Sequence, residues 1–230
     1  GASENIEWLL PWWYGKFLRW NKENIPLVIF DFGLSGKAHT WAKKNGITLQ
    51  KPVKKLDGWF YKPTALREAK GKYKVWLDVD CEIKGEFSEL FDFIQDDKLS
   101  VTLDRFHSWG CKYQTGVVGV KGDPKILKLW EKKCENPEGP YGRGDQELLW
   151  ELISETKKDY LAPLLPEKFN WLRMEFWTEK TPGSGKHPDL RIIHWTGGDG
   201  KKIIDTAIRN KISTIDASAA ILKYAKKKKK

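Results

Sequence analysis

Residues 74–83, with the sequence KVWLDVDCEI, decide the fold of this chain. The run is mostly apolar and has the length of a strand, so it is predicted to form a buried strand. Side chains alternate along a strand, and Asp78 and Asp80 are therefore expected on one face, with Val79 on the other. Two carboxylates at the end of an apolar strand offer hard oxygen ligands to a divalent cation. Such a pair can also simply solvate a strand end, and the bare pattern leaves both interpretations open.

Predicted strands and helices alternate around this stretch. Further strands are expected at residues 27–32, 46–49, 99–104, 115–122 and 190–194, and helices at 6–20, 36–45, 62–70, 124–133 and 145–155. A weaker helical periodicity runs through residues 203–224. Alternation of this kind predicts an α/β sheet covered by helices on both faces.

The length and composition indicate one folded domain. The chain has 230 residues, of which 40% are hydrophobic and 31% charged, as expected of a globular protein with a core. No run reaches the ~18 apolar residues of a membrane-spanning helix, so no transmembrane segment is predicted. The first residues show no secretory signal, and three cysteines without paired spacing exclude a disulfide framework or a cysteine-rich zinc site. These features favour a reducing compartment, and a cytoplasmic location is expected.

The net charge of +10 is unevenly distributed. Half of it lies in the lysine run 226–230, which is typical of a solvated tail. Such a tail can contact an anionic membrane surface weakly, and no specific binding of nucleic acid is predicted. The moderately basic remainder suits an enzyme whose substrate is a phosphorylated anion. Thirteen tryptophans are spread along the chain, where they can pack in the core or stack on a sugar.

His194 ends the predicted strand 190–194 and adds a nitrogen ligand to the two carboxylates. Together with Asp78 and Asp80 it makes a set suited to Mn²⁺, whereas an all-oxygen set would suit Mg²⁺ or Ca²⁺ better. A single histidine after a strand is also frequently structural. The sequence therefore predicts a cation site with a purely structural alternative.

A glycine-rich turn is predicted directly after His194, at residues 195–202 with the sequence WTGGDGKK. Consecutive glycines let backbone N–H groups turn toward a phosphate, and the lysines add positive charge. The segment is not a Walker loop, because Trp195 stands at the position of the first glycine. It is interpreted as a clasp for a diphosphate, with a hairpin turn and solvated lysines as the alternative.

Two further segments carry polar residues where a ligand could approach. Gln114 opens the sequence QTGVVGV, in which small residues let the backbone lie close to a ligand. The sequence GRGDQ at 142–146 places Asp145 and Gln146 at the start of a predicted helix. Asp145 can also act only as a helix cap or first-turn acid.

The order of these motifs resembles the retaining nucleotide-sugar transferases of glycosyltransferase family eight. The segments are DVD at 78–80, TGVVGV at 115–120, GDQELL at 144–149 and HWTGGDGK at 194–201, and the resemblance covers residues 5–204. It implies a single-domain GT-A, Rossmann-like fold with a mixed, mainly parallel sheet. The domain is expected over residues 1–204, with a first strand upstream of Gly1, and a helical segment with the lysine tail over 205–230.

The same resemblance implies which residues carry the chemistry. The metal group would be Asp78, Asp80 and His194; the donor-binding group Asp78, Gln114, Gly197, Gly200 and Lys201; and the catalytic, sugar-contacting pair Asp145 and Gln146. The cofactor would be Mn²⁺ or Mg²⁺, the donor a UDP-sugar, and the acceptor a glycan or another hydroxyl compound. The family commonly has asparagine at the position of Gln114.

Two other classes of function fit parts of the pattern. A metal-dependent nucleotidyltransferase or sugar-phosphate pyrophosphorylase would use a similar sheet, but would normally show a glycine-rich, basic loop near its N-terminus. A non-catalytic carbohydrate- or nucleic-acid-binding module could use the aromatic residues and the lysine tail. That reading leaves the grouping of Asp78, Asp80 and His194 at strand ends unexplained.

Overall fold

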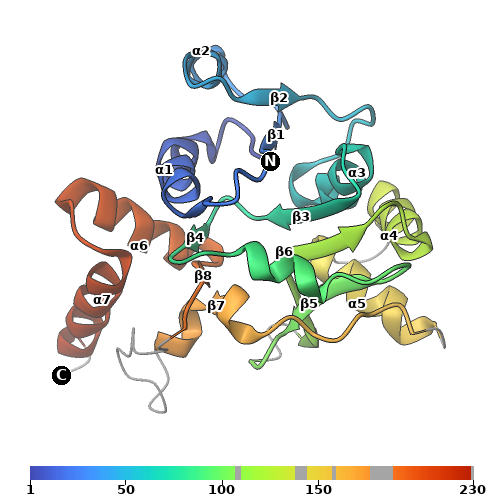
Figure 1. The fold of residues 1–230 in the computed structure, drawn as a ribbon. Helices are drawn as coiled ribbons and strands as arrows, with labels where there is room; N and C mark the ends of the chain where they lie inside the picture. The colour runs from blue at the N-terminus through green and yellow to red at the C-terminus, as the bar shows by residue number, and fades with distance from the viewer. Residues whose placement is uncertain (107–109, 138–143, 157–158, 177–188, 229–230) are drawn as a thin grey trace.

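The computed structural model describes residues 1–106, 110–137, 144–156, 159–176 and 189–228 (Figure 1). The strands are β1 (Val28–Phe30), β2 (Thr48–Gln50), β3 (Tyr73–Leu77), β4 (Cys81–Ile83), β5 (Leu99–Leu103), β6 (Tyr113–Lys121), β7 (Trp171–Leu172) and β8 (Ile192–His194). The α-helices are α1 (Leu10–Trp20), α2 (Gly36–Lys44), α3 (Tyr61–Glu68), α4 (Lys125–Glu135), α5 (Asp145–Glu155), α6 (Gly197–Asn210) and α7 (Thr214–Lys228). The expected α/β class is confirmed.

The strands form three small sheets of mixed direction. In the first, β1 and β2 are parallel; in the second, β6 is antiparallel to both β3 and β5; in the third, β8 is antiparallel to β4 and parallel to β7. The mixed character is as expected, but the expectation of mainly parallel pairing is corrected for the described strands. The reason is local: β5 and β6 follow each other without a helical crossover, which parallel neighbours need.

The stretch 74–83 does not form the single strand expected from its sequence. β3 ends at Leu77 in one sheet, and β4 begins at Cys81 in another. The amide of Cys81 donates to the carbonyl of Asp78 at 2.9 Å, which closes a tight turn between the two strands. Apolar periodicity continues through this turn and therefore cannot reveal it. As a result, Asp78 and Asp80 lie where the chain passes from one sheet to the next.

The segment after His194 also differs from the expectation. Residues 195–202 do not form a free turn, because α6 begins at Gly197. Ile203, Ile204 and Ala207 recur at helical spacing and are buried in the core, and they hold the helix against the sheet. α6 runs without interruption through the boundary expected at residue 204.

Two apolar clusters cover opposite sides of the sheet that contains β6, as predicted. In β6, Val117 belongs to a cluster shared with α1, β4, β8 and α6, whereas Val118 and Val120 belong to one shared with α3, α4 and α5. Figure 1 shows the same division, with α1 and α6 on one side of the strands and α3, α4 and α5 on the other. Trp130 and Trp195 are fully buried, so these tryptophans serve packing. Within the described residues, no helix is long and apolar enough to span a membrane.

Candidate functional site

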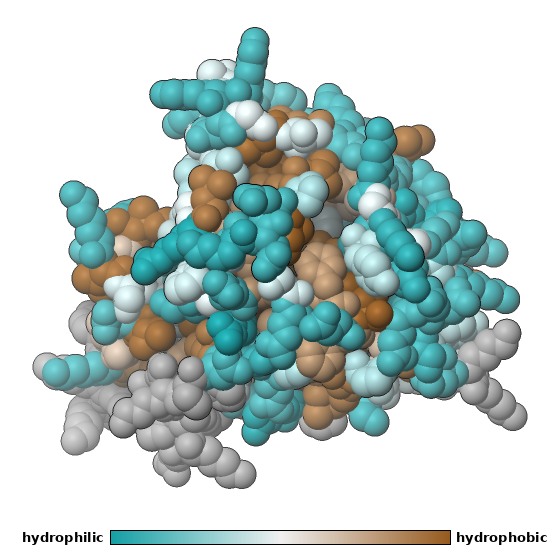
Figure 2. Space-filling model, viewed as in Figure 1, coloured by the Kyte–Doolittle hydropathy of each residue, from teal (hydrophilic) through white to brown (hydrophobic). Residues whose placement is uncertain are grey.

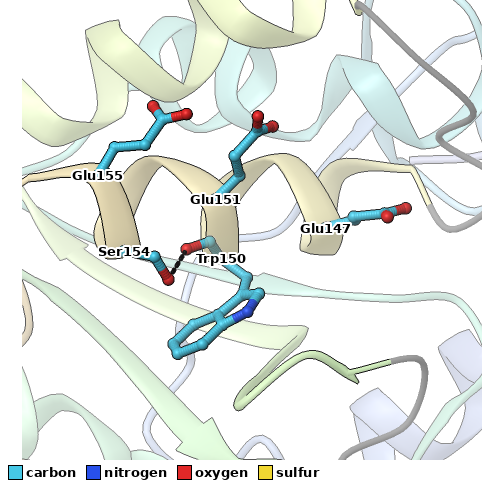
Figure 3. Close-up of a pocket in the computed structure, with 5 residues that line it drawn as sticks. All are labelled: Glu147, Trp150, Glu151, Ser154 and Glu155. Atoms are coloured by element: carbon cyan, nitrogen blue, oxygen red, sulfur yellow. Dashed lines mark hydrogen bonds between the residues drawn. The ribbon is translucent and has the colours of Figure 1, made fainter.

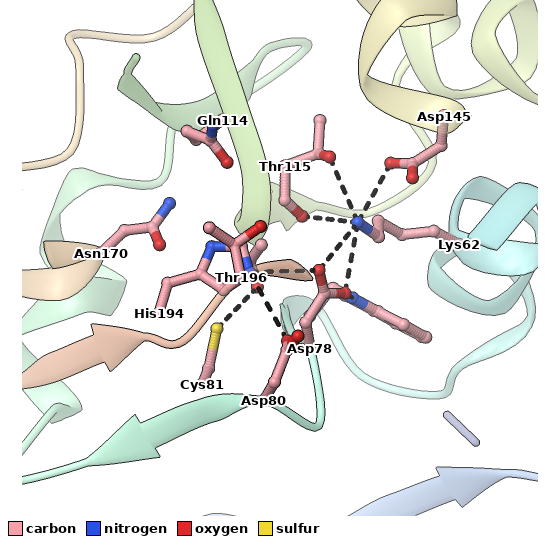
Figure 4. A network of polar contacts seen from close by, with 12 residues as sticks. Lys62, Asp78, Asp80, Cys81, Gln114, Thr115, Asp145, Asn170, His194 and Thr196 are labelled. Carbon is pink, nitrogen blue, oxygen red and sulfur yellow. Dashed lines mark hydrogen bonds and ion pairs between the residues drawn. The ribbon is translucent and has the colours of Figure 1, made fainter. Parts of the chain in front are cut away.

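The three residues predicted to bind metal come together in the fold (Figure 4). β4 pairs with β8 so that Cys81 lies opposite His194, which brings the histidine beside the turn that carries Asp78 and Asp80. Its Nε2 atom lies 3.5 Å from an oxygen of Asp80 and 3.9 Å from an oxygen of Asp78. The grouping expected from the sequence is therefore present in the geometry, although two separate sheets create it.

Gly116 in β6 makes room for the histidine. A Cβ atom at this position would lie 2.3 Å from the His194 ring, far inside van der Waals contact. The small residues of the TGVVGV segment were expected to let the backbone lie close to a ligand. Here the residue that approaches is His194, so the absence of a side chain at Gly116 gives the histidine ring its place.

Cys81 is a fourth potential ligand that the sequence analysis did not single out. One ligand atom each from Asp80, Cys81 and His194 lie within 4.8 Å of one another, and all three residues are buried. Burial raises the pKa of the Cys81 thiol well above its ordinary value, and the two nearby aspartates raise it further. The thiol donates weakly to the carbonyl of Gly116 at 3.5 Å. Its place directly after the DVD motif was the only sequence signal for it.

Lys62 is a second residue of this cluster that the sequence analysis did not single out. It is the second residue of α3 and is 2% exposed. Its ammonium group forms ion pairs with Asp145 at 3.0 Å and with Asp78 at 3.2 Å. It also donates to the carbonyl of Thr115 at 2.8 Å. Burial would lower the pKa of Lys62, but Asp145 and Asp78 outweigh it and raise the pKa above its ordinary range. Lys62 is therefore a permanent cation that joins α3, β6, α5 and the DVD turn.

Asp145 lies at the first position of α5 and is 4% exposed. The N-cap residue is Gly144, with φ 71°, and no side chain caps this helix. Burial, together with the nearby Asp78, raises the pKa of Asp145 above its ordinary value, and the Lys62 cation offsets only part of this rise. The carboxylate is thus held by the Lys62 ion pair rather than by a capping role. Gln146 is half-buried in the same turn, and the described contacts of the cluster do not include it.

Gln114 is placed beside the cluster but is engaged elsewhere. Its amide donates to Asp104 at 2.5 Å, and it is 4% exposed. In Figure 4 it lies on β6 apart from the aspartates. Its predicted contact with a donor stays a prediction.

The start of α6 brings Lys201 to the metal group. Its Nζ atom lies 3.0 Å from an oxygen of Asp80, and its side chain is 33% exposed. Gly197 has open space around it, whereas a Cβ at Gly200 would lie 1.7 Å from the carbonyl oxygen of Trp195. Gly197 is free to approach a ligand, and Gly200 is required for packing.

The charges in this cluster support one another. Burial would raise the pKa of Asp80, but His194 and Lys201 outweigh that and hold the pKa below its ordinary range. Asp80 is therefore ionised at neutral pH although it is 6% exposed. A buried carboxylate of this kind must be paired or bind a cation.

A separate shallow pocket lies on the outer side of α5 (Figure 3). It has a volume of about 450 Å³ and is lined by Glu147, Trp150, Glu151, Ser154 and Glu155. Ser154 donates to the carbonyl of Trp150 at 2.8 Å, an ordinary contact within a helix. None of the predicted site residues lines this pocket, so the candidate site is the cluster around Asp80.

No protein-family profile matches the sequence, and no curated protein matches it. Structural similarity is clear by contrast, and it is to glycosyltransferases. Glycosyltransferase GlyE of Streptococcus pneumoniae TIGR4, in its apo form, has a TM-score of 0.64 at 15% identity. The aligned part covers 86% of this chain and 54% of GlyE, so the chain spans about half the length of that protein.

Two further solved structures share the fold. Galactosyltransferase LgtC, solved with donor and acceptor sugar analogues, has a TM-score of 0.60 at 15% identity, and the match covers 85% of each chain. The bifunctional glycosyltransferase WbbM has a TM-score of 0.56 at 10% identity over 86% of this chain and 45% of its own. At these identities the likeness defines the fold alone: this chain has an α/β fold that is also found in these glycosyltransferases.

Proposed function

We propose that this protein is a glycosyltransferase that moves a sugar from a nucleotide-sugar donor, a UDP-sugar, to a hydroxyl group of a glycan or another acceptor. The observation that carries the proposal is the convergence of Asp78, Asp80 and His194 beside Lys201. The fold shared with GlyE and LgtC supports it, and LgtC was solved with sugar analogues of both donor and acceptor. The motif order supports a retaining enzyme of the family-eight type.

The donor atoms suit a divalent cation. The two carboxylates face the imidazole of His194, whose Nε2 atom lies 3.5 Å from Asp80 and 3.9 Å from Asp78. Carboxylates with one imidazole fit Mn²⁺, and Mg²⁺ would rely more on the two carboxylates. Asp78, Asp80 and His194 would hold the ion, which would neutralise charge on a departing diphosphate.

The start of α6 provides the remaining positive potential for a diphosphate. The N-terminus of a helix presents unpaired N–H groups that attract anions. Gly197 and Gly198 are exposed there, and Lys201 follows one turn later. Lys201 already reaches an oxygen of Asp80, which places its ammonium at the edge of the cation site. We assign the binding of the phosphates to these residues. They would act from the start of a helix, and not from the free turn that the sequence predicted.

We assign Asp145 and Lys62 to the part of the site that would contact the transferred sugar. Positive charge grows at the anomeric carbon as the nucleotide leaves, so a carboxylate held near it favours the transition state. Lys62 fixes Asp145 relative to Asp78 and keeps both acids compatible with burial. Gln146 is assigned to the same sugar because of its neighbouring position.

The proposal is tested by turnover with a panel of nucleotide sugars. The purified protein is incubated with UDP-, GDP- and ADP-sugars in Mn²⁺ or in EDTA, with simple sugars as acceptors, and nucleotide release is followed. Release from one UDP-sugar, dependent on Mn²⁺ and absent in Asp80→Asn, supports the proposal. Formation of UTP and a sugar 1-phosphate from the UDP-sugar, only when pyrophosphate is added, would favour a nucleotidyltransferase. Binding of sugars without turnover would favour a binding module.

A further inference from the structure

Trp59 is an exposed aromatic residue next to the candidate site. Tryptophan side chains are highly buried on average, and hydrophilic side chains cover much of the face of the molecule in Figure 2. Among the tryptophans that the structure describes, however, Trp59 is 54% exposed and Trp8 is 41% exposed. A single exposed ring is common on protein surfaces, so the position of the ring decides whether it has a function.

The ring of Trp59 lies against the start of α5. A Cβ atom at Gly144 would lie 1.7 Å from Nε1 of Trp59 and 1.8 Å from its Cδ1, so the edge of the indole packs directly on this glycine. Gly144 is the N-cap residue of α5 and directly precedes Asp145. The ring is therefore next to the carboxylate that we assign to the transferred sugar.

The residues that follow Trp59 fix the ring in place. Trp59 belongs to a short 3₁₀ helix, Gly58–Phe60, which packs against α3 and α4. Phe60 packs on the apolar cluster shared with α3, α4 and α5, and the ring of Tyr61 stacks on that of Phe32 with centroids 4.4 Å apart. A ring that is already held in one place loses little freedom when a ligand binds to it.

Trp59 lies at the opposite end of the site from the phosphate-binding residues. Lys201 pairs with Asp80 at 3.0 Å at one end of the cluster. In Figure 4, Asp145 lies on the other side of the cluster, with Asp78 between the two acids. A donor with its diphosphate at Lys201 and its sugar at Asp145 leaves the space at Trp59 for the molecule that receives the sugar.

We infer that the exposed face of Trp59 binds a sugar ring of the acceptor, so that the acceptor is a carbohydrate. The C–H groups on one face of a pyranose pack against the apolar face of an indole, while the hydroxyl groups at the rim stay in contact with water. A half-exposed ring suits a ligand that extends into solvent. The inference rests on the proposed function, which makes the ligand beside the transferred sugar an acceptor. The nucleotide base of the donor is the other planar or ring-shaped group that the experiment must separate.

Binding is measured first, without turnover. The probes are the methyl glycosides of glucose, galactose and mannose, and the control is glycerol, a hydroxyl compound without a ring. The indole N–H resonance of Trp59, identified by its loss in Trp59→Phe, is followed by NMR during each titration, alone and with UDP and Mn²⁺. At least one glycoside should give a saturable shift that glycerol does not give. No such shift with any glycoside, or a shift with UDP alone, would overturn the inference.

Kinetics with a glycoside acceptor then test the role of the ring. Trp59→Ala should raise the KM of the acceptor by about 10-fold, because a stacking contact is lost, and should leave kcat and the KM of the donor within about twofold. Trp59→Phe keeps an aromatic face and should stay within about threefold of the wild type. The matched control is Trp8→Ala, which removes another exposed tryptophan and should change none of these values. An unchanged KM of the acceptor in Trp59→Ala, or a fall in kcat alone, would give the ring a structural role at α5 and overturn the inference.

The two measurements also separate this inference from the proposed function. Binding of a glycoside at Trp59 in a protein that turns over no nucleotide sugar would contradict sugar transfer and leave a carbohydrate site at Trp59. Turnover that is the same in the wild type and in Trp59→Ala would contradict the role of Trp59 alone.

Discussion

Asp80 and Glu82 are both buried acids and lie two positions apart in the chain, yet their side chains have different kinds of partner. Glu82 accepts hydrogen bonds from Trp195 at 3.0 Å and from Thr214, and pairs with Lys16 at 2.9 Å. These partners belong to three separate parts of the fold. Among the described residues, the side chain of Asp80 pairs with Lys201 at 3.0 Å and with His194 at 3.5 Å.

The difference separates a structural acid, Glu82, from Asp80, the acid to which we assign a function. Burial opposes ionisation of Glu82, but Lys84, Lys16 and Thr214 hold its pKa below the ordinary value. Through its contacts with Lys16, Trp195 and Thr214, Glu82 links α1, β4 and α7. Asp80 faces a partly exposed lysine and a histidine, both of which also bind phosphates or metals in proteins. The partners of a buried carboxylate are therefore more informative than its burial.

The largest effect is expected at Lys62, which combines both kinds of role. Lys62→Met leaves Asp78 and Asp145 without their shared cation, and should lower the free energy of unfolding by about 3–5 kcal/mol. Urea denaturation followed by circular dichroism measures this loss. Combining it with Asp145→Asn should recover part of the stability, because one of the unpaired charges is removed. Additive losses in the double variant would show that the two residues do not interact.

Asp80→Asn and His194→Ala test the functional half of the comparison. Each should lower Mn²⁺-dependent nucleotide release by roughly 10²–10³-fold, the usual cost of removing one electrostatic contact to a departing group. The matched control is Glu82→Gln, which should keep turnover within about threefold. Thermal unfolding should show that all three variants are folded. Full activity of Asp80→Asn in EDTA would remove the cation site from the account.

Asp145→Asn should have a smaller effect on turnover, of about 10–100-fold. The substitution keeps a hydrogen-bonding side chain but removes charge that favours the transition state, so kcat falls while affinity for UDP is unchanged. Calorimetric titration of UDP with Mn²⁺ checks the second point. Wild-type turnover would return Asp145 to a structural role at the start of α5.

Glu82→Gln should cost about 1–3 kcal/mol of stability, as for other buried acceptors that lose a partner. The wild-type contribution depends on pH. Because the folded pKa of Glu82 lies below its ordinary value of 4.5, its stabilisation is present above pH 4.5 and is lost as the pH falls through the folded pKa. The variant should therefore lose less stability than the wild type on acidification from pH 6 to pH 3. Parallel acid profiles would show that Glu82 does not set this sensitivity.

Deletion of Lys226–Lys230 is expected to have the smallest effect. A run of lysines is expected to contribute little packed surface, so turnover on a soluble acceptor should stay within about twofold of the full chain. Rates on a small sugar acceptor measure this directly. A large loss would make the tail part of the active unit.

The grouping of Asp78, Asp80 and His194 was predictable because each residue lies at the end of an apolar run. Asp78, Asp80 and His194 carry that signal in local sequence, and the sheet edges bring them together. Lys62 and Cys81 carried no such signal. The role of Lys62 depends on Asp145, far away in the sequence, and its helix looks like an ordinary surface helix that begins near a proline.

The breaks in regular structure were the least predictable features. Apolar periodicity passes unchanged through the turn between β3 and β4, and the glycines after His194 conceal the start of α6. In both places long-range packing decides the conformation. The pairing of β8 with β4 fixes the turn after β3, and burial of Ile203 in the core fixes the start of α6. Local patterns therefore singled out residues that lie together in the fold, but they did not describe the backbone that positions them.

Calorimetric titration of UDP into the wild-type protein, with Mn²⁺ and then with EDTA, tests the central claim most directly. The account predicts binding with Mn²⁺, a loss of at least about 100-fold in affinity in EDTA, and the same loss in Asp80→Asn with Mn²⁺ present. Glu82→Gln should bind as the wild type does. Equal affinity for UDP with and without Mn²⁺, or an Asp80→Asn variant that binds normally, would contradict the assignment of Asp78, Asp80 and His194 to a cation and diphosphate site.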